Sequence, residues 1–102
     1  MQILKLVNMV SYQDGSIVSK EIIKKSTGTV TLFAFDKGQG LSEHTAPFDA
    51  LVNVLDGQAE IKISGKPFIV KDGEMMIMPA DEPHSVQAIE KFKMLLVLVK
   101  NE

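Results

Sequence analysis

The sequence predicts an all-β fold, a sandwich or barrel of short antiparallel strands. Segments rich in β-branched and aromatic residues, or alternating between polar and apolar residues, recur along the chain. Turn sequences containing Asp-Gly or Ser-Gly-Lys-Pro separate them. No segment longer than a couple of turns keeps a helical period with caps. At 102 residues and 45% hydrophobic composition, the chain is expected to form one domain, residues 1–102, with its own core.

Eight strands are predicted, and turn residues mark the breaks between them. Segment 16–23 alternates loosely, segment 29–35 combines β-branched with aromatic residues, and segment 60–63 alternates strictly. The predicted strands in chain order are residues 16–23, 29–35, 50–55, 60–63, 68–70, 74–78, 85–88 and 92–99. The predicted turns are residues 14–15, 56–57, 64–67 and 72–73. There is no internal repeat, linker or low-complexity segment.

Composition excludes several classes of function. The chain has no cysteine, which leaves no disulfide, thiol nucleophile or Cys-based metal site and favours a cytoplasmic protein. Lys5 interrupts the apolar N-terminus and no small-residue cleavage site follows, so no signal peptide is expected. The apolar run at 94–99 is too short to cross a membrane.

Charge argues against nucleic acid as a partner. The net charge is −2, and all eleven basic residues are lysines scattered among acidic residues. Arginine, which clamps phosphates bidentately and stacks on bases, is absent. Neither a basic stripe nor a phosphate-binding loop is present, so no nucleic-acid partner is expected.

Both histidines lie in stretches that also carry glycine and proline. In the first, five residues separate Gly38 from His44, and Gly57 closes the stretch. In the second, Gly73, Pro79 and His84 follow one another in GEMMIMPADEPH.

These stretches resemble the two motifs of the small single-domain cupins of the cupin_2 type. The first family motif reads Gly, five residues, His-x-His, three or four residues, Glu, six residues, Gly. The second reads Gly, five residues, Pro-x-Gly, two residues, His, three residues, Asn. The resemblance covers about residues 29–99 and implies a double-stranded β-helix, or jelly-roll, barrel over that range. It also implies a homodimer, to which an N-terminal strand segment within residues 1–28 contributes.

The metal-binding positions of the motifs are degenerate in this chain. The resemblance implies a site made by two histidines and a glutamate of the first motif and the histidine of the second. Ala46 and Ala50 stand at two of those places, which leaves His44 and His84 as weak candidate ligands. Stable transition-metal sites generally need three or more protein ligands. We therefore expect no required metal cofactor, with a divalent transition metal as the alternative.

Strand parity predicts which side chains surround the histidines. Side chains alternate between the two faces of a strand, so Glu43 and Asp49 point outward if the histidines point inward. A carboxylate can return only through a bulge near Phe48-Asp49, which makes Asp49 the candidate for a missing third ligand. The predicted pocket is lined by His44, Ala46, Ala50, Val52, His84 and Val86.

Three other features have both a structural and a functional interpretation. Met75, Met76, Met78 and Met94 are core filler or a soft pocket wall, and Met76 and Met78 share one face. Tyr12 is interpreted as an N-terminal packing or interface residue. The apolar segment 3–10 is expected to form an edge strand of its own barrel or to cover a partner subunit.

The function predicted from these features is binding of a small, largely apolar ligand in the barrel, without a required metal. The sequence leaves catalysis open. The alternative is a metal-dependent cupin enzyme, a dioxygenase, isomerase or lyase that uses a weak His44/His84 site. A third possibility is a structural dimer or partner-binding module with a filled barrel.

Overall fold

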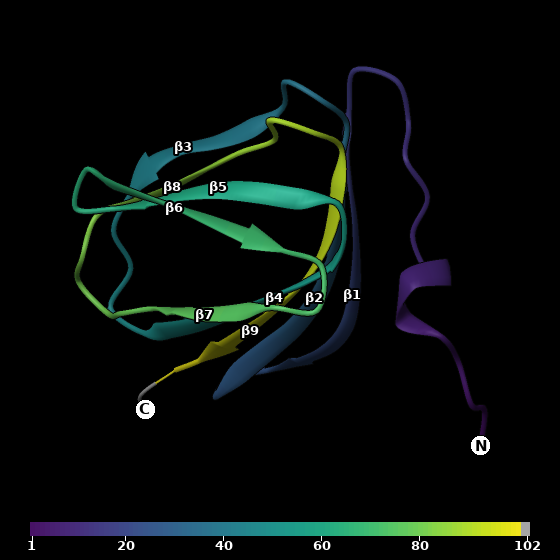
Figure 1. Ribbon diagram of the computed structural model, residues 1–102. Coiled ribbons are helices and arrows are strands. Elements are labelled where there is room, and N and C mark those ends of the chain that lie inside the picture. Colours follow the sequence, from purple (N-terminus) through teal and green to yellow (C-terminus); the bar gives the residue numbers. More distant parts are fainter. Residues whose placement is uncertain (101–102) are drawn as a thin grey trace.

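A computed structural model describes residues 1–100 of the chain, and it is built almost entirely of strands (Figure 1). The elements are η1 (Leu6–Asn8), β1 (Ile17–Lys25), β2 (Gly28–Phe35), β3 (Gly40–His44), β4 (Asp49–Asp56), β5 (Gln58–Ile63), β6 (Lys66–Lys71), β7 (Met75–Met78), β8 (His84–Gln87) and β9 (Phe92–Val99). The all-β prediction is confirmed, and each of the eight predicted strands is present with its ends shifted by a few residues at most.

The strands form two antiparallel sheets that face each other. The large sheet has the order β1-β2-β9-β4-β7, and the small sheet has the order β3-β8-β5-β6. The core between them includes Phe35 and Phe92, whose rings stack with centroids 4.6 Å apart. This two-sheet arrangement is the jelly-roll barrel that the sequence resemblance implies.

Alternation along β4 shows how the sequence selects the inner face. Ala50, Val52 and Val54 are buried, while Leu51 and Asn53 between them are only partly buried. The predicted turn at Asp56-Gly57 ends the strand. Gly57 has a φ of +76°, and a Cβ there would lie 2.2 Å from the carbonyl oxygen of Lys91. Only glycine fits this position without displacing the backbone before β9.

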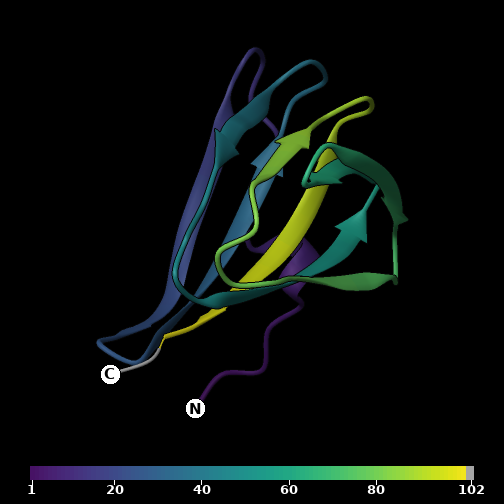
Figure 2. The ribbon, with the colours of Figure 1, turned by 90° about the vertical axis from the view of Figure 1, so that its left-hand side faces the viewer.

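The fate of the N-terminal segment differs from the expected edge strand. Residues 1–16 form no strand. A single 3₁₀ turn, η1, lies on the outside of the large sheet, and both ribbon views show it there (Figures 1 and 2). Val10 is buried against Leu32 and Ala34, and the Lys93 amino group donates to the carbonyl of Val7 at 2.6 Å. Side-chain packing and a lysine, rather than strand pairing, therefore fasten this segment.

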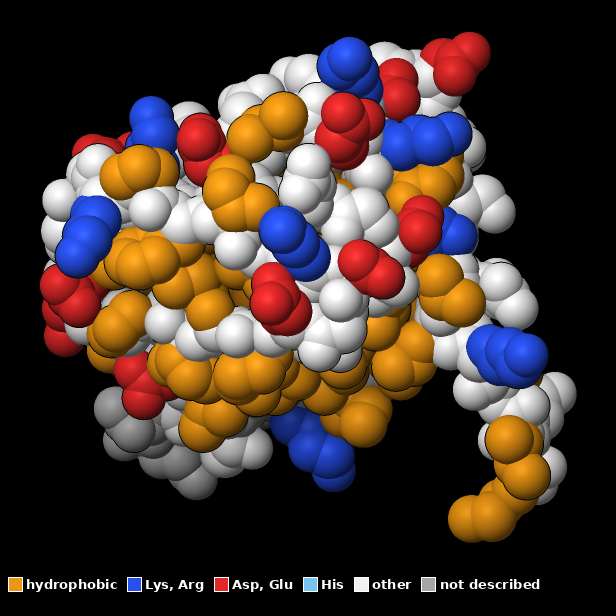
Figure 3. Space-filling model, in the orientation of Figure 1, with side chains coloured by type: hydrophobic (Ala, Val, Ile, Leu, Met, Phe, Trp, Pro, Cys, Tyr) orange, Lys and Arg blue, Asp and Glu red, His pale blue; other side chains and the backbone are white. Residues whose placement is uncertain are grey.

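The part of the large sheet's outer face that the N-terminal segment does not cover is apolar and exposed. The exposed hydrophobic side chains of this face are those of Ile23, Met75, Ile77 and Val99. Figure 3 shows hydrophobic side chains gathered over the lower part of the molecule, where Figure 1 draws β4, β7 and β9. Ile3 and Leu4, in the projecting N-terminal end, are exposed as well.

One strand was not among those predicted. β3 begins at Gly40 and carries mostly exposed residues, so it lacks an apolar alternation. It pairs with β8 through a register shift between Leu41 and His44.

Within residues 1–100, no helix has the length and hydropathy needed to cross a lipid bilayer.

Candidate ligand-binding cavity

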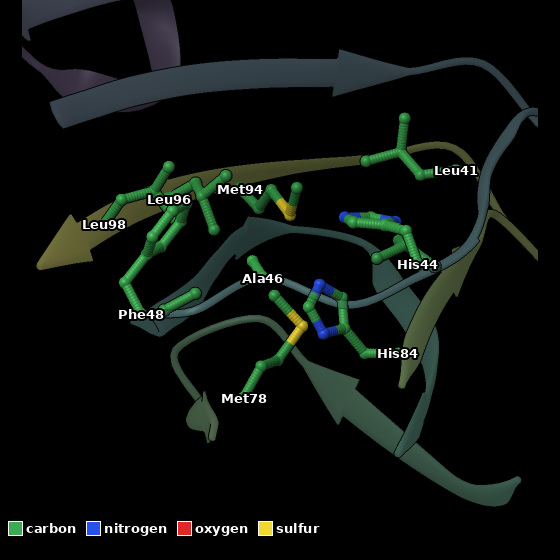
Figure 4. Close-up of a pocket in the computed structure, with 11 residues that line it drawn as sticks. Leu41, His44, Ala46, Phe48, Met78, His84, Met94, Leu96 and Leu98 are labelled. Atoms are coloured by element: carbon green, nitrogen blue, oxygen red, sulfur yellow. The ribbon is translucent and has the colours of Figure 1, made fainter. Parts of the chain in front are cut away.

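A cavity of about 190 Å³ lies between the two sheets, beside the histidines (Figure 4). Strands β3 and β8 of the small sheet form one wall, and β4, β7 and β9 of the large sheet form the other. The residues that line it are Leu41, His44, Ala46, Phe48, Ala50, Met78, His84, Val86, Met94, Leu96 and Leu98. Nine of the eleven are apolar, the two others are histidines, and none carries a carboxylate or an amino group.

The structure brings together five of the six residues predicted for the pocket. His44, Ala46, Ala50, His84 and Val86 all line the cavity. Val52 points to the same side of β4 as Ala50, but it is fully buried in the core and does not reach the cavity. Strand parity gave the correct face for Val52 and could not give its depth.

A bulge in β3 places His44. Leu41 lies opposite Val86 and His44 lies opposite His84, so β3 carries one more residue than β8 between these pairs. In a regular strand, residues three apart face opposite sides. The bulge lets both Leu41 and His44 line the cavity, and it lies before His44 rather than near Phe48-Asp49, where the sequence made one conceivable.

The two imidazole rings meet edge to face at one end of the cavity. Their centroids are 4.4 Å apart, and their planes cross at 68°. His84 is buried, with 5% of its surface exposed, whereas His44 is exposed. Figure 4 shows both rings at one end, with Phe48, Leu96 and Leu98 at the other.

Backbone carbonyls fix the orientation of both rings. His44 Nδ1 lies 2.8 Å from the carbonyl oxygen of Ser42, and His84 Nδ1 lies 3.1 Å from that of Glu82. A carbonyl oxygen only accepts, so each Nδ1 carries the proton, and in the neutral ring Nε2 is then an acceptor. Within residues 1–100, neither Nε2 has a hydrogen-bond partner. No buried side-chain nitrogen or oxygen of the partly or fully buried residues there lacks a partner, so Nε2 of His84 has access to solvent or to the cavity, and His44 is itself an exposed residue.

The donor set does not fit the metal that metal-binding cupins hold. Among the described residues, no three His, Cys, Asp or Glu side chains converge on one point. Asp49, the candidate third ligand, is exposed and accepts a hydrogen bond from the backbone N–H of Ala80 at 2.8 Å. Glu43 is exposed as well. His44 and His84 are thus the two nitrogen donors of the cavity, without a protein carboxylate beside them.

Six lining residues lie outside the predicted pocket set: Leu41, Phe48, Met78, Met94, Leu96 and Leu98. Of these, Met78 and Met94 had the alternative interpretation of a soft pocket wall. Three of the six alternate along β9 on the same face as Phe92, so the period of that strand could have identified them once its inner face was known. Met78 lies opposite Ala50, so its side chain faces inward. Met76 is partly buried against the core, and Met75 is exposed.

Tyr12 lies away from the cavity, among the residues that hold the N-terminal segment. Its hydroxyl donates to a carboxylate oxygen of Asp56. Burial is the larger cause, and the Asp56 carboxylate the smaller cause, of a phenol pKa well above its usual value. The amino groups of Lys91 and Lys93 lie 5.0 and 5.1 Å from its ring centroid. The side chain also packs against the cluster of Val10, Leu32 and Ala34, so its surroundings are those of a packing residue.

Comparison with known proteins places this architecture among close structural relatives. The cupin_2 family, described as a cupin domain, matches residues 31–100. The chain is similar to a conserved protein of unknown function from Streptococcus pyogenes, with 38% identity and a TM-score of 0.95 over 99% of this chain and 89% of that one. A cupin 2 conserved barrel domain protein from Leptotrichia buccalis is 51% identical, with a TM-score of 0.93, over 95% of this chain and 47% of that chain. A cupin superfamily protein from Desulfitobacterium hafniense, 22% identical with a TM-score of 0.93 over 98% of this chain and 92% of that one, shares the fold. No curated protein matches.

Proposed function

The chain belongs to the cupin family, and from this membership and the lining of its cavity we propose that it binds a small, largely apolar molecule without needing a metal. The lining carries the proposal. Nine apolar side chains and two imidazoles surround about 190 Å³, and apolar walls with a few oriented polar groups are typical of small-molecule sites.

A metal-dependent enzyme is the second candidate, and the two Nε2 atoms, which have no hydrogen-bond partner within residues 1–100, are the observation that favours it. The Nδ1 atoms of His44 and His84 lie 2.8 and 3.1 Å from backbone carbonyl oxygens. Metal-ligating histidines are often anchored in this way through one ring nitrogen, which leaves the other, here Nε2, for the metal. Stable sites for zinc or iron use three or more protein ligands, and the described residues supply two. The ligand set therefore favours binding without metal.

Benzene is a suitable probe of the proposed function, because apolar cavities of this size class take up benzene from water. We expect benzene to shift the methyl NMR signals of Met78 and Met94, which line the cavity, more than that of the exposed Met75. Ala46→Leu should fill the cavity and abolish these shifts. Thr45→Leu introduces the same side chain at the neighbouring exposed position, outside the lining, and should preserve them.

Two results would contradict the proposal. One is a wild-type protein whose Met78 and Met94 signals ignore benzene. The other is a stoichiometric transition metal in the purified protein, found by elemental analysis, that the fold needs for stability. Native mass spectrometry of the same sample would show any small molecule that co-purifies.

We also propose that the protein is a homodimer through the outer face of the large sheet. Ile23, Ile77 and Val99 leave an apolar surface beside the N-terminal segment, and Ile3 and Leu4 are exposed at the end of that segment. A second copy related by two-fold symmetry would bury both sets at once.

A cytoplasmic location remains the expectation, with the absence of cysteine as its support.

Light scattering on the wild type and on Ile77→Lys tests the dimer. The wild type should have the mass of two chains, and the variant should dissociate because the interface would have to bury a lysine. Lys62→Ala, on the exposed side of the small sheet, is the matched control and should stay dimeric. A wild-type monomer at high concentration would contradict the proposal.

A further inference from the structure

The histidine end of the cavity restricts the polar group that a ligand can carry. Both Nδ1 atoms face backbone carbonyls, so both Nε2 atoms present lone pairs rather than protons in neutral rings. We infer that the ligand is a neutral hydroxyl compound, an alcohol or phenol with a compact hydrocarbon body, whose O–H donates to Nε2 of His44 or His84. This inference rests on the proposed function and specifies its ligand class.

Carboxylates are disfavoured by the same geometry. An anion needs donors, and neither neutral ring offers an N–H to the cavity, because its single N–H is on Nδ1 and donates to a carbonyl oxygen. No lysine lines the cavity to compensate the charge. Burying an unpaired carboxylate among methyl and thioether groups would be costly.

Cations are disfavoured for a related reason. The lining includes no aspartate or glutamate, and Asp49 is engaged by the backbone of Ala80. An ammonium group would exchange its hydration for neutral imidazoles alone. A hydroxyl group loses much less hydration, and it supplies the one donor that an Nε2 acceptor needs.

The volume limits the hydrocarbon body. An apolar cavity of about 150 Å³ holds benzene, and this one measures about 190 Å³. The remaining space suits one hydroxyl group on a single ring or on a branched chain of similar size. With the hydroxyl at the histidines, the hydrocarbon would extend toward Phe48, Leu96 and Leu98 at the other end (Figure 4).

Phenol, toluene and benzoate form a matched series for the test. Phenol and toluene have the same shape and differ only in a hydroxyl against a methyl, and benzoate adds a charge. The affinities are measured by calorimetric or NMR titration at pH 8, where histidine side chains are ordinarily neutral. Affinity should decrease in the order phenol, toluene, benzoate. Phenol should bind about tenfold more tightly than toluene, because toluene leaves the Nε2 acceptors without partners.

Variants assign that difference to the histidines. In His44→Leu combined with His84→Leu, the preference for phenol over toluene should disappear while toluene still binds. Ser85→Ala alters the neighbour of His84 on β8 that lies outside the cavity lining, and it should retain the preference. In the wild type, phenol should also shift the imidazole ¹⁵N signals of Nε2, and toluene should not. The wild-type series decides the matter even if the double variant does not fold.

Each outcome separates the two levels of the proposal. Equal affinity for phenol and toluene would overturn the hydroxyl inference and leave the proposed apolar binding function standing. Tightest binding of benzoate would also overturn it, since an anion needs donors at that end. If none of the three compounds, nor benzene, binds to the wild type, the proposed function fails and the inference fails with it.

Discussion

The two walls of the cavity differ in chemistry and in what lies behind them. The small-sheet wall presents Leu41, His44, His84 and Val86, and its two imidazoles are oriented by their own backbone. The large-sheet wall presents only aliphatic and thioether side chains, and it is continuous with the core around Phe35 and Phe92. On the proposed function, the first wall would determine which ligand is accepted, and the second would determine how stable the barrel is.

Met94→Ala should have the largest effect on stability. Met94 is 1% exposed on β9 and belongs to the core cluster, so truncation removes packing from the large-sheet wall. A loss of about 2–5 kcal/mol in the free energy of unfolding is expected, as for comparable truncations of buried side chains. Urea denaturation measures it. Ile69→Ala, at a site 47% exposed on β6 of the small sheet, is the control and should change stability by less than about 0.5 kcal/mol.

Ala46→His combined with Ala50→Glu should convert the cavity into a metal site. Both alanines line it beside His44 and His84, so the double variant would offer four ligands. Without metal it should be less stable than the wild type, because position 50 is buried. Zinc should restore stability, by about 2.7 kcal/mol at a hundredfold excess over Kd. Thermal melts with and without zinc test this, and a double variant whose melting temperature does not respond to zinc would contradict the four-ligand arrangement.

His44→Leu should have a small effect on stability. His44 is exposed, and its hydrogen bond to the Ser42 carbonyl contributes roughly 1 kcal/mol at most. The same urea titrations compare it with Met94→Ala. If the two variants lose similar amounts, the small-sheet wall also carries the stability of the barrel, and the proposed division between the walls is wrong.

Treatment of the wild type with a strong chelator should have the smallest effect. Two nitrogens without a third protein ligand bind metal weakly, so the fold should not depend on it. The melting temperature should be unchanged within error. A drop of several degrees that added metal reverses would show that the small-sheet wall does hold a structural ion.

Local patterns were enough to predict the turns, the histidine pair and every strand of residues 1–100 except β3. Apolar alternation is a local property, and so is the turn chemistry that ends β4 at Gly57. Motif spacing placed His44 and His84 at equivalent positions of the barrel, and cross-strand pairing brings them together. Parity then identified Ala50 and Val86 as inward-facing.

The remaining features depend on partners that are distant in the chain. β3 has little apolar alternation and is defined by pairing with β8, so its bulge was not readable from its own residues. Val52 and Ala50 share a face, and only the packing of the opposite sheet separates core from cavity. The N-terminal segment is held by Lys93 and Tyr12, which no periodicity connects to residues 7–10.

The position of β9 has a consequence for the order in which the protein can assemble. β9 lies in the middle of the large sheet, between β2 and β4, although every other strand precedes it in the chain. The β1–β2 hairpin cannot join β4 until residues 92–99 have left the ribosome. Pairings between such distant segments are slow to form, because a long loop must close first. Since β9 also supplies Met94, Leu96 and Leu98, the cavity is complete only after this strand has inserted.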